Sequence, residues 1–141
     1  MLTGAELRDD TISVFLVDDV PELRELIRYG LEGDEDFVVV GEAGDGAAAI
    51  EGVAETKPSA VLLDLSMPGM DGLEAIPEIR RGRPDVAIVI LSGFSASRME
   101  RKARERGADG YVEKGTPMEE LREIVREAVG RQVPKRGNSV A

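Results

Sequence analysis

Five short apolar segments recur along the chain, and each is followed by a stretch with a different spacing of apolar residues. They read ISVFLV, FVVVGEA, AVLLDL, VAIVIL and GYVE, and they begin at Ile12, Phe37, Ala60, Val86 and Gly110. Because these segments are apolar almost throughout, rather than at every second position, they are typical of strands buried on both faces. The pattern therefore predicts a parallel sheet of five strands.

Apolar residues three or four positions apart predict a helix after each of the first four strands. Pro77 falls inside the third of these segments and lacks a backbone donor, so we expect that helix to bend or to begin late. The expected apolar faces are Leu23, Leu26, Ile27, Gly30 and Leu31; Ala47, Ile50, Val53 and Ala54; Leu73, Ile76 and Ile79; and Ala96, Met99 and Ala103.

The final helix carries its own start and stop signals. Thr116 is the expected N-cap, Pro117 the first helical residue and Glu119 the partner of Thr116 in a capping box. Gly130 is the expected end. The apolar face between them comprises Leu121, Ile124, Val125, Ala128 and Val129.

Strands that alternate with helices favour an α/β fold, here a doubly wound five-stranded parallel sheet with helices on both faces. The chain has 141 residues, 42% of them hydrophobic, which suits a single domain with one core. We expect this domain at residues 11–130. Residues 1–10 would then form an N-terminal extension, and residues 131–141, which lose the periodicity, a flexible C-terminal tail.

Composition excludes several classes of chemistry. The chain has 28 Asp and Glu against 18 Lys and Arg, a net charge of −10, so we expect no direct binding to nucleic acid. Without Cys or His it has no disulfide, no Cys/His zinc site, no cysteine nucleophile and no imidazole base. Because the sequence shows neither a signal-peptide pattern nor an apolar stretch of membrane length, we expect a cytoplasmic protein without membrane contact.

Polar residues interrupt the pattern where the predicted strands end. Asp18 and Asp19 follow the first strand, Asp64 ends the third, Ser92 ends the fourth and Lys114 follows the fifth. In open α/β sheets, ligands bind outside the carboxyl ends of the strands, where the strand order reverses. We therefore expect these side chains to gather at one edge of the sheet.

Three converging carboxylates form an oxygen-rich site that suits Mg²⁺. Asp18 and Asp19 are adjacent like charges, and a cation would relieve their repulsion. An ionised Asp64 would then be able to act as a nucleophile toward a phosphoryl group without a general base. Lys114 would supply a fixed positive charge and Ser92 a hydroxyl donor for the phosphoryl oxygens.

From about Ile12 to Gly130 the chain resembles the receiver domain of two-component response regulators, which has a flavodoxin-like fold. The matching segments are LVDDVPELR, VLLDLSMPGMDG, VILSG, GADGYVEKG and the final amphipathic helix. No single segment is decisive, but all five occur in the family's order and on the expected strands.

The resemblance implies a role for each of seven residues. Asp64 would be the phosphoacceptor, and Lys114 would contact the phosphoryl group. Mg²⁺ would be held by Asp18, Asp19, Asp64 and the backbone carbonyl of Ser66. Ser92 and Tyr111 would be the switch residues, which move when Asp64 is phosphorylated.

The resemblance also implies partners. A phosphohistidine on a histidine kinase or phosphotransfer protein would be the donor, and the chain would be a signalling switch that catalyses its own phosphorylation and slow dephosphorylation rather than a turnover enzyme. Its output would be altered affinity for a downstream protein or a second copy, through the face made of the fourth helix, fifth strand and fifth helix.

Two positions depart from the commonest receiver pattern. Lys114 is followed by Gly115, with proline only at Pro117, which is similar to receivers attached to LuxR-type helix-turn-helix DNA-binding domains. The chain is thus expected to be a stand-alone receiver or a fragment of such a regulator. Gly93 stands where alanine is frequent and would loosen the loop that follows it.

Other interpretations stay open at this point. A Mg²⁺-dependent phosphohydrolase of the haloacid-dehalogenase type also uses an aspartyl nucleophile, but that family needs a second aspartate where this chain has Ser66. A degenerate receiver would bind partners without phosphorylation. Individually, Asp18 or Asp19 would serve as a helix cap, Asp64 as a turn residue, and the basic segment SASRMERKARERG as solvated surface.

Overall fold

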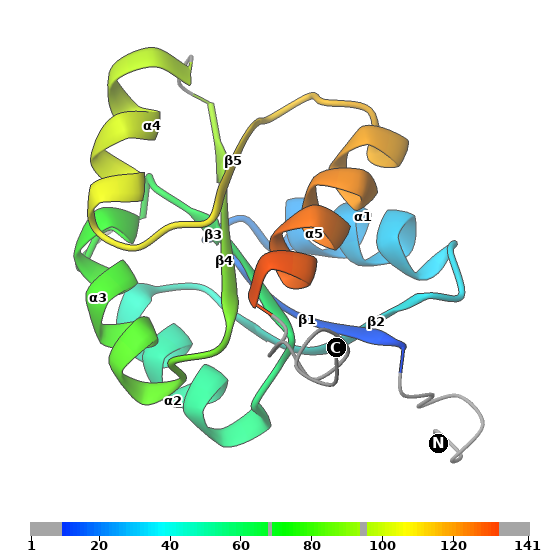
Figure 1. Cartoon of the computed structure of the whole chain (residues 1–141), viewed down its shortest axis with the longest axis horizontal. Coiled ribbons are helices and arrows are strands. Elements are labelled where there is room, and N and C mark those ends of the chain that lie inside the picture. Colours follow the sequence, from blue (N-terminus) through cyan, green and yellow to red (C-terminus); the bar gives the residue numbers. More distant parts are fainter. Residues whose placement is uncertain (1–9, 68, 94–95, 133–141) are drawn as a thin grey trace, which may run out of the picture.

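The sheet consists of five parallel strands in the order β2-β1-β3-β4-β5 (Figure 1). The computed structural model describes residues 10–67, 69–93 and 96–132. The strands are β1 (Ile12–Val17), β2 (Phe37–Ala43), β3 (Ala60–Asp64), β4 (Ala87–Ser92) and β5 (Gly110–Glu113). Each apolar segment forms a strand, so the predicted parallel sheet is confirmed.

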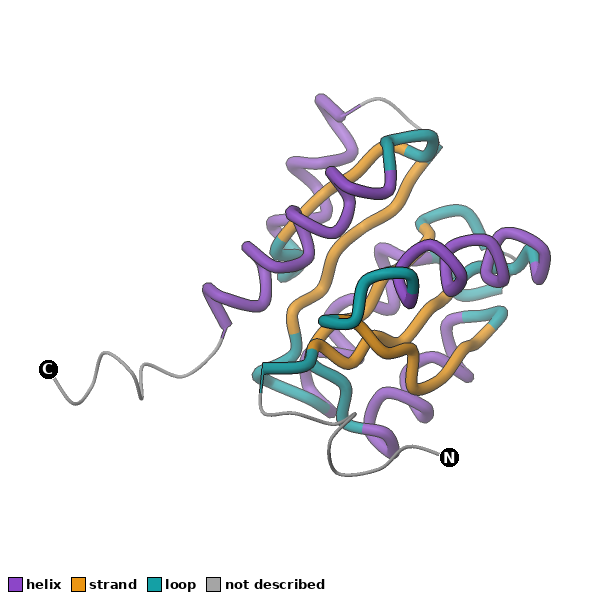
Figure 2. Tube along the Cα trace, turned by 90° about the vertical axis from the view of Figure 1, so that its right-hand side faces the viewer, coloured by secondary structure: helices purple, strands orange, loops and turns teal. Residues whose placement is uncertain are grey.

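Helices cover both faces of this sheet (Figures 1 and 2). They are α1 (Pro21–Glu32), α2 (Gly46–Thr56), α3 (Gly72–Gly82), α4 (Ala96–Glu105) and α5 (Met118–Gln132). Helices α1 and α5 pack on one face, and α2, α3 and α4 pack on the other. This arrangement confirms the doubly wound α/β fold. No helix in the described part of the chain is long and apolar enough to cross a membrane.

The central strands are buried on both faces, which explains their continuous apolarity. In β3, the side chains of Val61 and Leu63 pack in the cluster beneath α2, α3 and α4. The side chain of Leu62 points the other way, into the cluster beneath α1 and α5. All three are almost fully buried, so each strand residue contributes to one of two apolar layers.

Helix α1 buries a narrower face than its sequence predicts. Ile27 and Leu31 are buried against the sheet, but Leu26 is 64% exposed. At 100° per residue, Leu26 lies roughly 120° around the helix from the midpoint of the two buried side chains. The expectation that Leu26 belongs to the core face is therefore wrong.

Helix α3 begins early and contains its proline. The Asp71 carboxylate accepts a hydrogen bond from the N–H of Glu74 at 2.9 Å, and the Glu74 carboxylate accepts one from the N–H of Asp71 at 3.1 Å. This capping box starts the helix at Gly72, so Pro77 lies in the helix interior. The expected late start is wrong because the cap precedes the proline by six residues.

Helix α5 begins at Met118, one residue later than expected. The Thr116 hydroxyl donates to the backbone carbonyl of Glu113 at 2.7 Å, so it closes the preceding turn instead of capping the helix. The N–H of Leu121 donates to the carbonyl of Pro117 at 3.0 Å, which puts Pro117 in the N-cap position.

Helix α5 also extends to Gln132, past the expected end at Gly130. In its last turn, Nη2 of Arg131 donates to the backbone carbonyl of Asp109 at 2.8 Å, which joins the end of the helix to the start of β5. The first two residues of the expected tail are therefore helical. Residues 1–9 and 133–141 lie outside the described residues, so the extension and the flexible tail stay predictions.

Candidate functional site

The strand order reverses between β1 and β3, and the acidic residues meet at this point. Asp18 directly follows Val17, which is paired with Leu63, so Asp18 and Asp64 leave neighbouring strands side by side. Carboxylate oxygens of Asp18, Asp19 and Asp64 all lie within 4.8 Å of one another. Asp18 and Asp64 are only 3% and 2% exposed, whereas Asp19 faces solvent. The expected acidic cluster is present.

The turn after β1 presents Asp18 toward the sheet edge. Its backbone N–H continues the pairing with β2 by donating to the carbonyl of Ala43 at 3.1 Å. Its Oδ1 accepts a hydrogen bond from the N–H of Val20 at 2.9 Å. Val20 itself occupies the N-cap position of α1 and Pro21 the first helical position, so neither Asp18 nor Asp19 caps the helix. The alternative interpretation of these aspartates as caps is wrong.

Lys114 reaches both buried carboxylates from the end of β5. Its Nζ lies 3.4 Å from Oδ2 of Asp18 and 3.4 Å from Oδ1 of Asp64. The backbone N–H of Lys114 donates to the carbonyl of Ser92 at 2.7 Å, which fixes its main chain to the end of β4. One ammonium group is thus shared by two carboxylates that are removed from water.

The environment of Asp64 disfavours its ionised form. Burial is the main cause and raises the pKa of its carboxyl group, and the nearby charge of Asp18 raises it further. The N–H of Ser66, which donates to Oδ1 at 3.1 Å, and the ammonium of Lys114 lower the pKa but do not cancel the effect of burial. A further positive charge at this site would favour the ionised form of Asp64.

The donor set fits a hard divalent cation. Oδ2 of Asp18 and Oδ2 of Asp64 are buried and accept no hydrogen bond from any described residue. Buried carboxylate oxygens that accept no hydrogen bond are costly, and a bound cation would satisfy them. All the available ligands are oxygens, and such a site suits Mg²⁺ better than a softer metal. The acidic cluster is therefore compatible with Mg²⁺.

The remaining predicted residues lie on β4 and β5 and just beyond the end of β3. Ser92 ends β4, is 1% exposed, and follows Leu91, the residue paired with Asp64. Tyr111 lies in β5, is half-buried, and packs against the apolar cluster on the α4 side of the sheet. Ser66 touches the site through its N–H bond to Asp64. The structure thus groups Ser92 and Lys114 with the acids and places Tyr111 further back along its strand.

Gly72 is a site residue that the sequence reasoning missed. A Cβ at this position would lie 2.4 Å from the carbonyl oxygen of Asp64 and 2.7 Å from Cα of Leu65. The N–H of Gly72 also donates to the carbonyl of Leu65 at 3.1 Å. The start of α3 therefore lies directly against the end of β3, and only glycine permits this approach. The signal was available in the segment VLLDLSMPGMDG, which ends at this glycine.

Comparison with known protein families agrees with this geometry. The model of the response regulator receiver domain family matches residues 14–126 of the chain. The chain belongs to this family. Its acidic cluster and Lys114 lie within the matched region, and the receiver domain function expected from the sequence is confirmed.

The relatives of this receiver include a transcriptional regulatory protein and a response regulator protein. The transcriptional regulatory protein YxjL of Bacillus subtilis (strain 168) is 39% identical over 122 residues, which cover 86% of this chain and 56% of that protein. The response regulator protein VraR of Staphylococcus epidermidis is 37% identical over 115 residues, or 82% of this chain and 55% of VraR. The chain therefore spans about half the length of these curated relatives.

A solved structure shares both the fold and the sequence pattern. The crystal structure of a two-component response regulator of the LuxR family from Aurantimonas sp. SI85-9A1 superposes with a TM-score of 0.82 at 36% identity. The match covers 86% of each chain. The resemblance to LuxR-type receivers that the sequence suggested is thus confirmed.

Proposed function

We propose that this receiver domain accepts a phosphoryl group on Asp64 from a phosphohistidine on a histidine kinase or phosphotransfer protein. The observation that carries the proposal is the position of Lys114, whose ammonium lies 3.4 Å from Asp64 and 3.4 Å from Asp18 at the strand-order reversal. The two buried carboxylates share the single positive charge of Lys114. An anionic phosphoryl group would therefore need a further cation at this site.

In the proposed step, a carboxylate oxygen of Asp64 attacks the phosphorus atom and forms a P–O bond. The P–N bond to the donor histidine breaks, and the imidazole nitrogen keeps the electron pair and takes a proton from solvent. Lys114 offsets the charge on the phosphoryl oxygens, and the Ser92 hydroxyl donates a hydrogen bond to one of them. The chain would thus catalyse its own modification once per signal, as a switch rather than a turnover enzyme.

Asp18, Asp19, Asp64 and the backbone carbonyl of Ser66 would hold Mg²⁺ in this site. When bound, Mg²⁺ supplies charge neutralisation at the carboxylates and at the phosphoryl oxygens. The raised pKa of Asp64 supports this assignment, as do the Oδ2 atoms of Asp18 and Asp64, which accept no hydrogen bond from any described residue. The protein's own contribution is to hold the acids close together and largely out of water.

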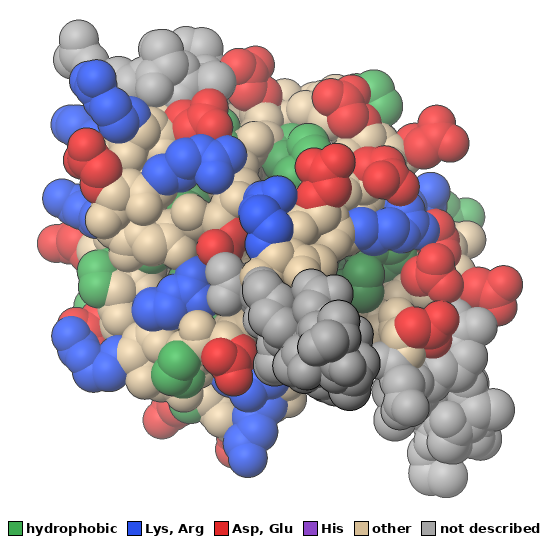
Figure 3. Space-filling view, viewed as in Figure 1, with side chains coloured by type: hydrophobic (Ala, Val, Ile, Leu, Met, Phe, Trp, Pro, Cys, Tyr) green, Lys and Arg blue, Asp and Glu red, His purple; other side chains and the backbone are tan. Residues whose placement is uncertain are grey.

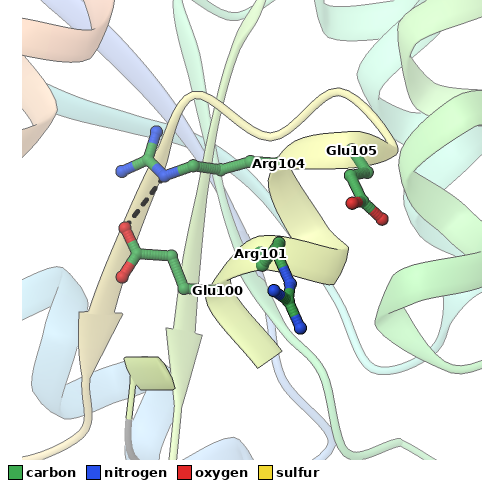
Figure 4. A pocket seen from close by; sticks show the side chains of 4 residues that line it. All are labelled: Glu100, Arg101, Arg104 and Glu105. Atoms are coloured by element: carbon green, nitrogen blue, oxygen red, sulfur yellow. Dashed lines mark hydrogen bonds and ion pairs between the residues drawn. The ribbon is translucent and has the colours of Figure 1, made fainter. Parts of the chain in front are cut away.

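The face made of α4, β5 and α5 is proposed as the output surface. Among the α4 side chains that the structure describes, Ala103 is fully buried and Met99 half-buried, so the helix has few large anchors. Charged side chains of both signs cover this side of the molecule, with few hydrophobic groups between them (Figure 3). A pocket on α4 is lined by Glu100, Arg101, Arg104 and Glu105 (Figure 4).

Phosphorylation would draw Ser92 toward the phosphoryl group and Tyr111 inward, and α4 would shift with them. The output would be altered affinity for a downstream protein or a second copy of the chain. Because this chain spans only about half of relatives that include transcriptional regulatory proteins, a DNA-binding module is the proposed downstream element, and the receiver itself would not contact DNA. We expect the exchange to occur in the cytoplasm, where kinases meet ATP.

Intact mass spectrometry tests the proposal. The protein would be incubated with acetyl phosphate, with and without Mg²⁺, beside the variants Asp64→Asn and Asp85→Asn. Asp85 is exposed and lies outside the site, so its substitution is a matched control. A single phosphoryl adduct that requires Mg²⁺ and Asp64 but not Asp85 is expected. An adduct that survives in Asp64→Asn would overturn the assignment.

Assays with a generic phosphate ester and with a phosphorylated histidine kinase separate two other functions. Continuous hydrolysis of a generic phosphate ester would favour a haloacid-dehalogenase type of phosphohydrolase, although Ser66 occupies the place of that family's second aspartate. The absence of an adduct with both acetyl phosphate and a phosphorylated histidine kinase would favour a receiver that binds partners without phosphorylation.

A further inference from the structure

Arg24 joins the turn that carries the acidic pair to the neighbouring strand. Its Nη1 donates to the backbone carbonyl of Asp18 at 2.5 Å, and its Nε donates to Oε1 of Glu42 at 2.9 Å. Arg24 lies in the first turns of α1, and Glu42 lies in β2. The Arg24 side chain is 19% exposed and the Glu42 side chain 26% exposed, and the hydrogen bond to the Asp18 carbonyl is partly buried. None of the roles assigned above to the site uses this residue.

Glu42 provides a fixed anchor for this link. It lies in β2 opposite Leu16 of β1, so the sheet holds its backbone. Its carboxylate also accepts a hydrogen bond from Nε of Arg28 at 2.8 Å. Burial acts to raise the pKa of Glu42, but hydrogen bonds from the two arginines and their charges outweigh burial and lower it. Glu42 therefore stays ionised and keeps Arg24 oriented.

The carbonyl that Arg24 holds belongs to the peptide between Asp18 and Asp19. Fixing this carbonyl fixes the plane of that peptide and hence the direction in which Asp19 leaves the turn. Asp18 is also held by Val20 and Ala43, but Asp19 is exposed, so packing does not position its carboxylate. The backbone has to do so.

We infer that Arg24 is a positioning residue for the metal site, which holds the Asp18–Asp19 peptide so that the Asp19 carboxylate faces Asp64. The inference rests on the proposed function of this acidic cluster. A guanidinium suits the task because its planar fork donates in fixed directions to two acceptors at once. A lysine ammonium is a compact point charge and would form a well-aligned hydrogen bond to only one of these acceptors. Groups that orient metal ligands in this way typically contribute about 10-fold to 100-fold in metal affinity.

Arg28 offers a matched control within the same helix. It donates to the same Glu42 carboxylate and carries the same charge, but within the described part of the chain it forms no hydrogen bond to Asp18. Arg28→Gln therefore removes one charge and one Glu42 contact and leaves the link to the acidic turn in place. Arg24→Gln removes the same charge together with that link.

The test is a titration of the unphosphorylated, ¹⁵N-labelled chain with MgCl₂. The amide chemical shifts of Asp19 and Ser66 report the binding of Mg²⁺. Relative to the unaltered chain, Arg24→Gln is expected to raise the Kd for Mg²⁺ about tenfold, Arg24→Lys by less, and Arg28→Gln by less than about twofold. Urea unfolding of each variant shows that the domain is folded. At saturating Mg²⁺, phosphorylation of Arg24→Gln by acetyl phosphate should approach the rate of the unaltered chain, because the metal restores the arrangement.

Equal Kd values for Mg²⁺ in Arg24→Gln and the unaltered chain would overturn the inference. Equal losses of Mg²⁺ affinity in Arg24→Gln and Arg28→Gln would also overturn it, because the effect would then come from charge alone. A reduced maximal phosphorylation rate with unchanged Mg²⁺ affinity would also overturn it. If the unaltered chain shows no saturable shift with Mg²⁺, the proposed function of the cluster fails, and the inference fails with it.

Discussion

Nζ of Lys114 lies at the same distance, 3.4 Å, from Oδ1 of Asp64 and from Oδ2 of Asp18. Both carboxylates are buried, and the third member of the cluster, Asp19, faces solvent beside them. The described cluster therefore sets three negative charges against one positive charge. Two negative charges remain to be balanced, which is the charge of one divalent cation.

Replacing Lys114 by methionine is expected to slow phosphorylation of Asp64 by about a hundredfold, because the phosphoryl oxygens lose a preorganised cation. The measurement is the rate of adduct formation with acetyl phosphate at saturating Mg²⁺, followed by intact mass. Lys102→Met, on the exposed side of α4, serves as the control and should phosphorylate normally. Equal rates for the two variants would contradict the role of Lys114.

Asp64→Asn is expected to stabilise the metal-free domain at neutral pH. Because burial raises the pKa of Asp64 above its usual 3.8, the folded state holds the proton to higher pH than the unfolded state does. Stability therefore falls as pH rises between the unfolded and folded pKa values, and the ionised carboxylate costs stability above them. Urea midpoints should be higher for Asp64→Asn at pH 7, with the difference vanishing below about pH 3.8.

Added Mg²⁺ provides the control for this prediction. A ligand that binds only the folded state raises its stability, so Mg²⁺ should raise the midpoint of the unaltered chain more than that of Asp64→Asn, which lacks one carboxylate ligand. A lower midpoint for Asp64→Asn than for the unaltered chain at pH 7 without metal would show that the buried carboxylate is stabilising.

The link between Arg126 and Asp34 gives the opposite pH dependence. The backbone N–H of Asp36 lowers the pKa of Asp34, burial opposes this, and the hydrogen bond and charge of Arg126, 2.7 Å away, lower it further. A lowered pKa contributes stability that is present above the unfolded value of 3.8 and is lost as pH falls through the folded value. Asp34→Asn should therefore cost about 1 kcal/mol at pH 7 and progressively less as the pH falls below 3.8.

Urea unfolding of Asp34→Asn across this pH range, beside Asp85→Asn, would check the assignment. Asp85 is exposed and its substitution should leave stability nearly unchanged at every pH. A cost for Asp34→Asn that persists at low pH would point to packing rather than to charge as its origin.

The sequence was sufficient for the sheet and the acidic cluster because both depend on strand position. A strand buried on both faces has to be apolar throughout, so β3 and β4 were visible as continuous apolar segments. Parallel strands end at the same edge, so the sequence alone predicts that Asp18 and Asp64 meet there. The roles of Asp64, Lys114 and Ser92 were predicted from their chemistry at the strand ends, whereas the roles of Ser66 and Tyr111 came only from the resemblance to the receiver family.

The features that were missed depend on contacts between distant segments. Leu26 fits the helical spacing, but only the position of the sheet shows that it faces solvent. The Thr116 hydroxyl suited a cap equally well, but it donates to Glu113 instead. Arg24 gave no signal at all, because its acceptors Asp18 and Glu42 are brought together by the pairing of β1 with β2.

Two glycine substitutions should have opposite effects, although both glycines lie in helices. In Gly72→Ala the new Cβ would meet the backbone of Asp64 and Leu65, neither of which is the end of a flexible side chain. The end of β3 and the start of α3 would have to separate, at a cost of about 2 kcal/mol or more, and the Asp64 carboxylate would move with them.

In Gly130→Ala the Cβ would meet nothing within 4 Å, and the gain in helix propensity should stabilise the domain by about 0.5–1 kcal/mol. Urea unfolding measures both changes, and weaker Mg²⁺ binding is expected in Gly72→Ala alone; a neutral Gly72→Ala would show that the close approach of α3 to β3 is not required by the site.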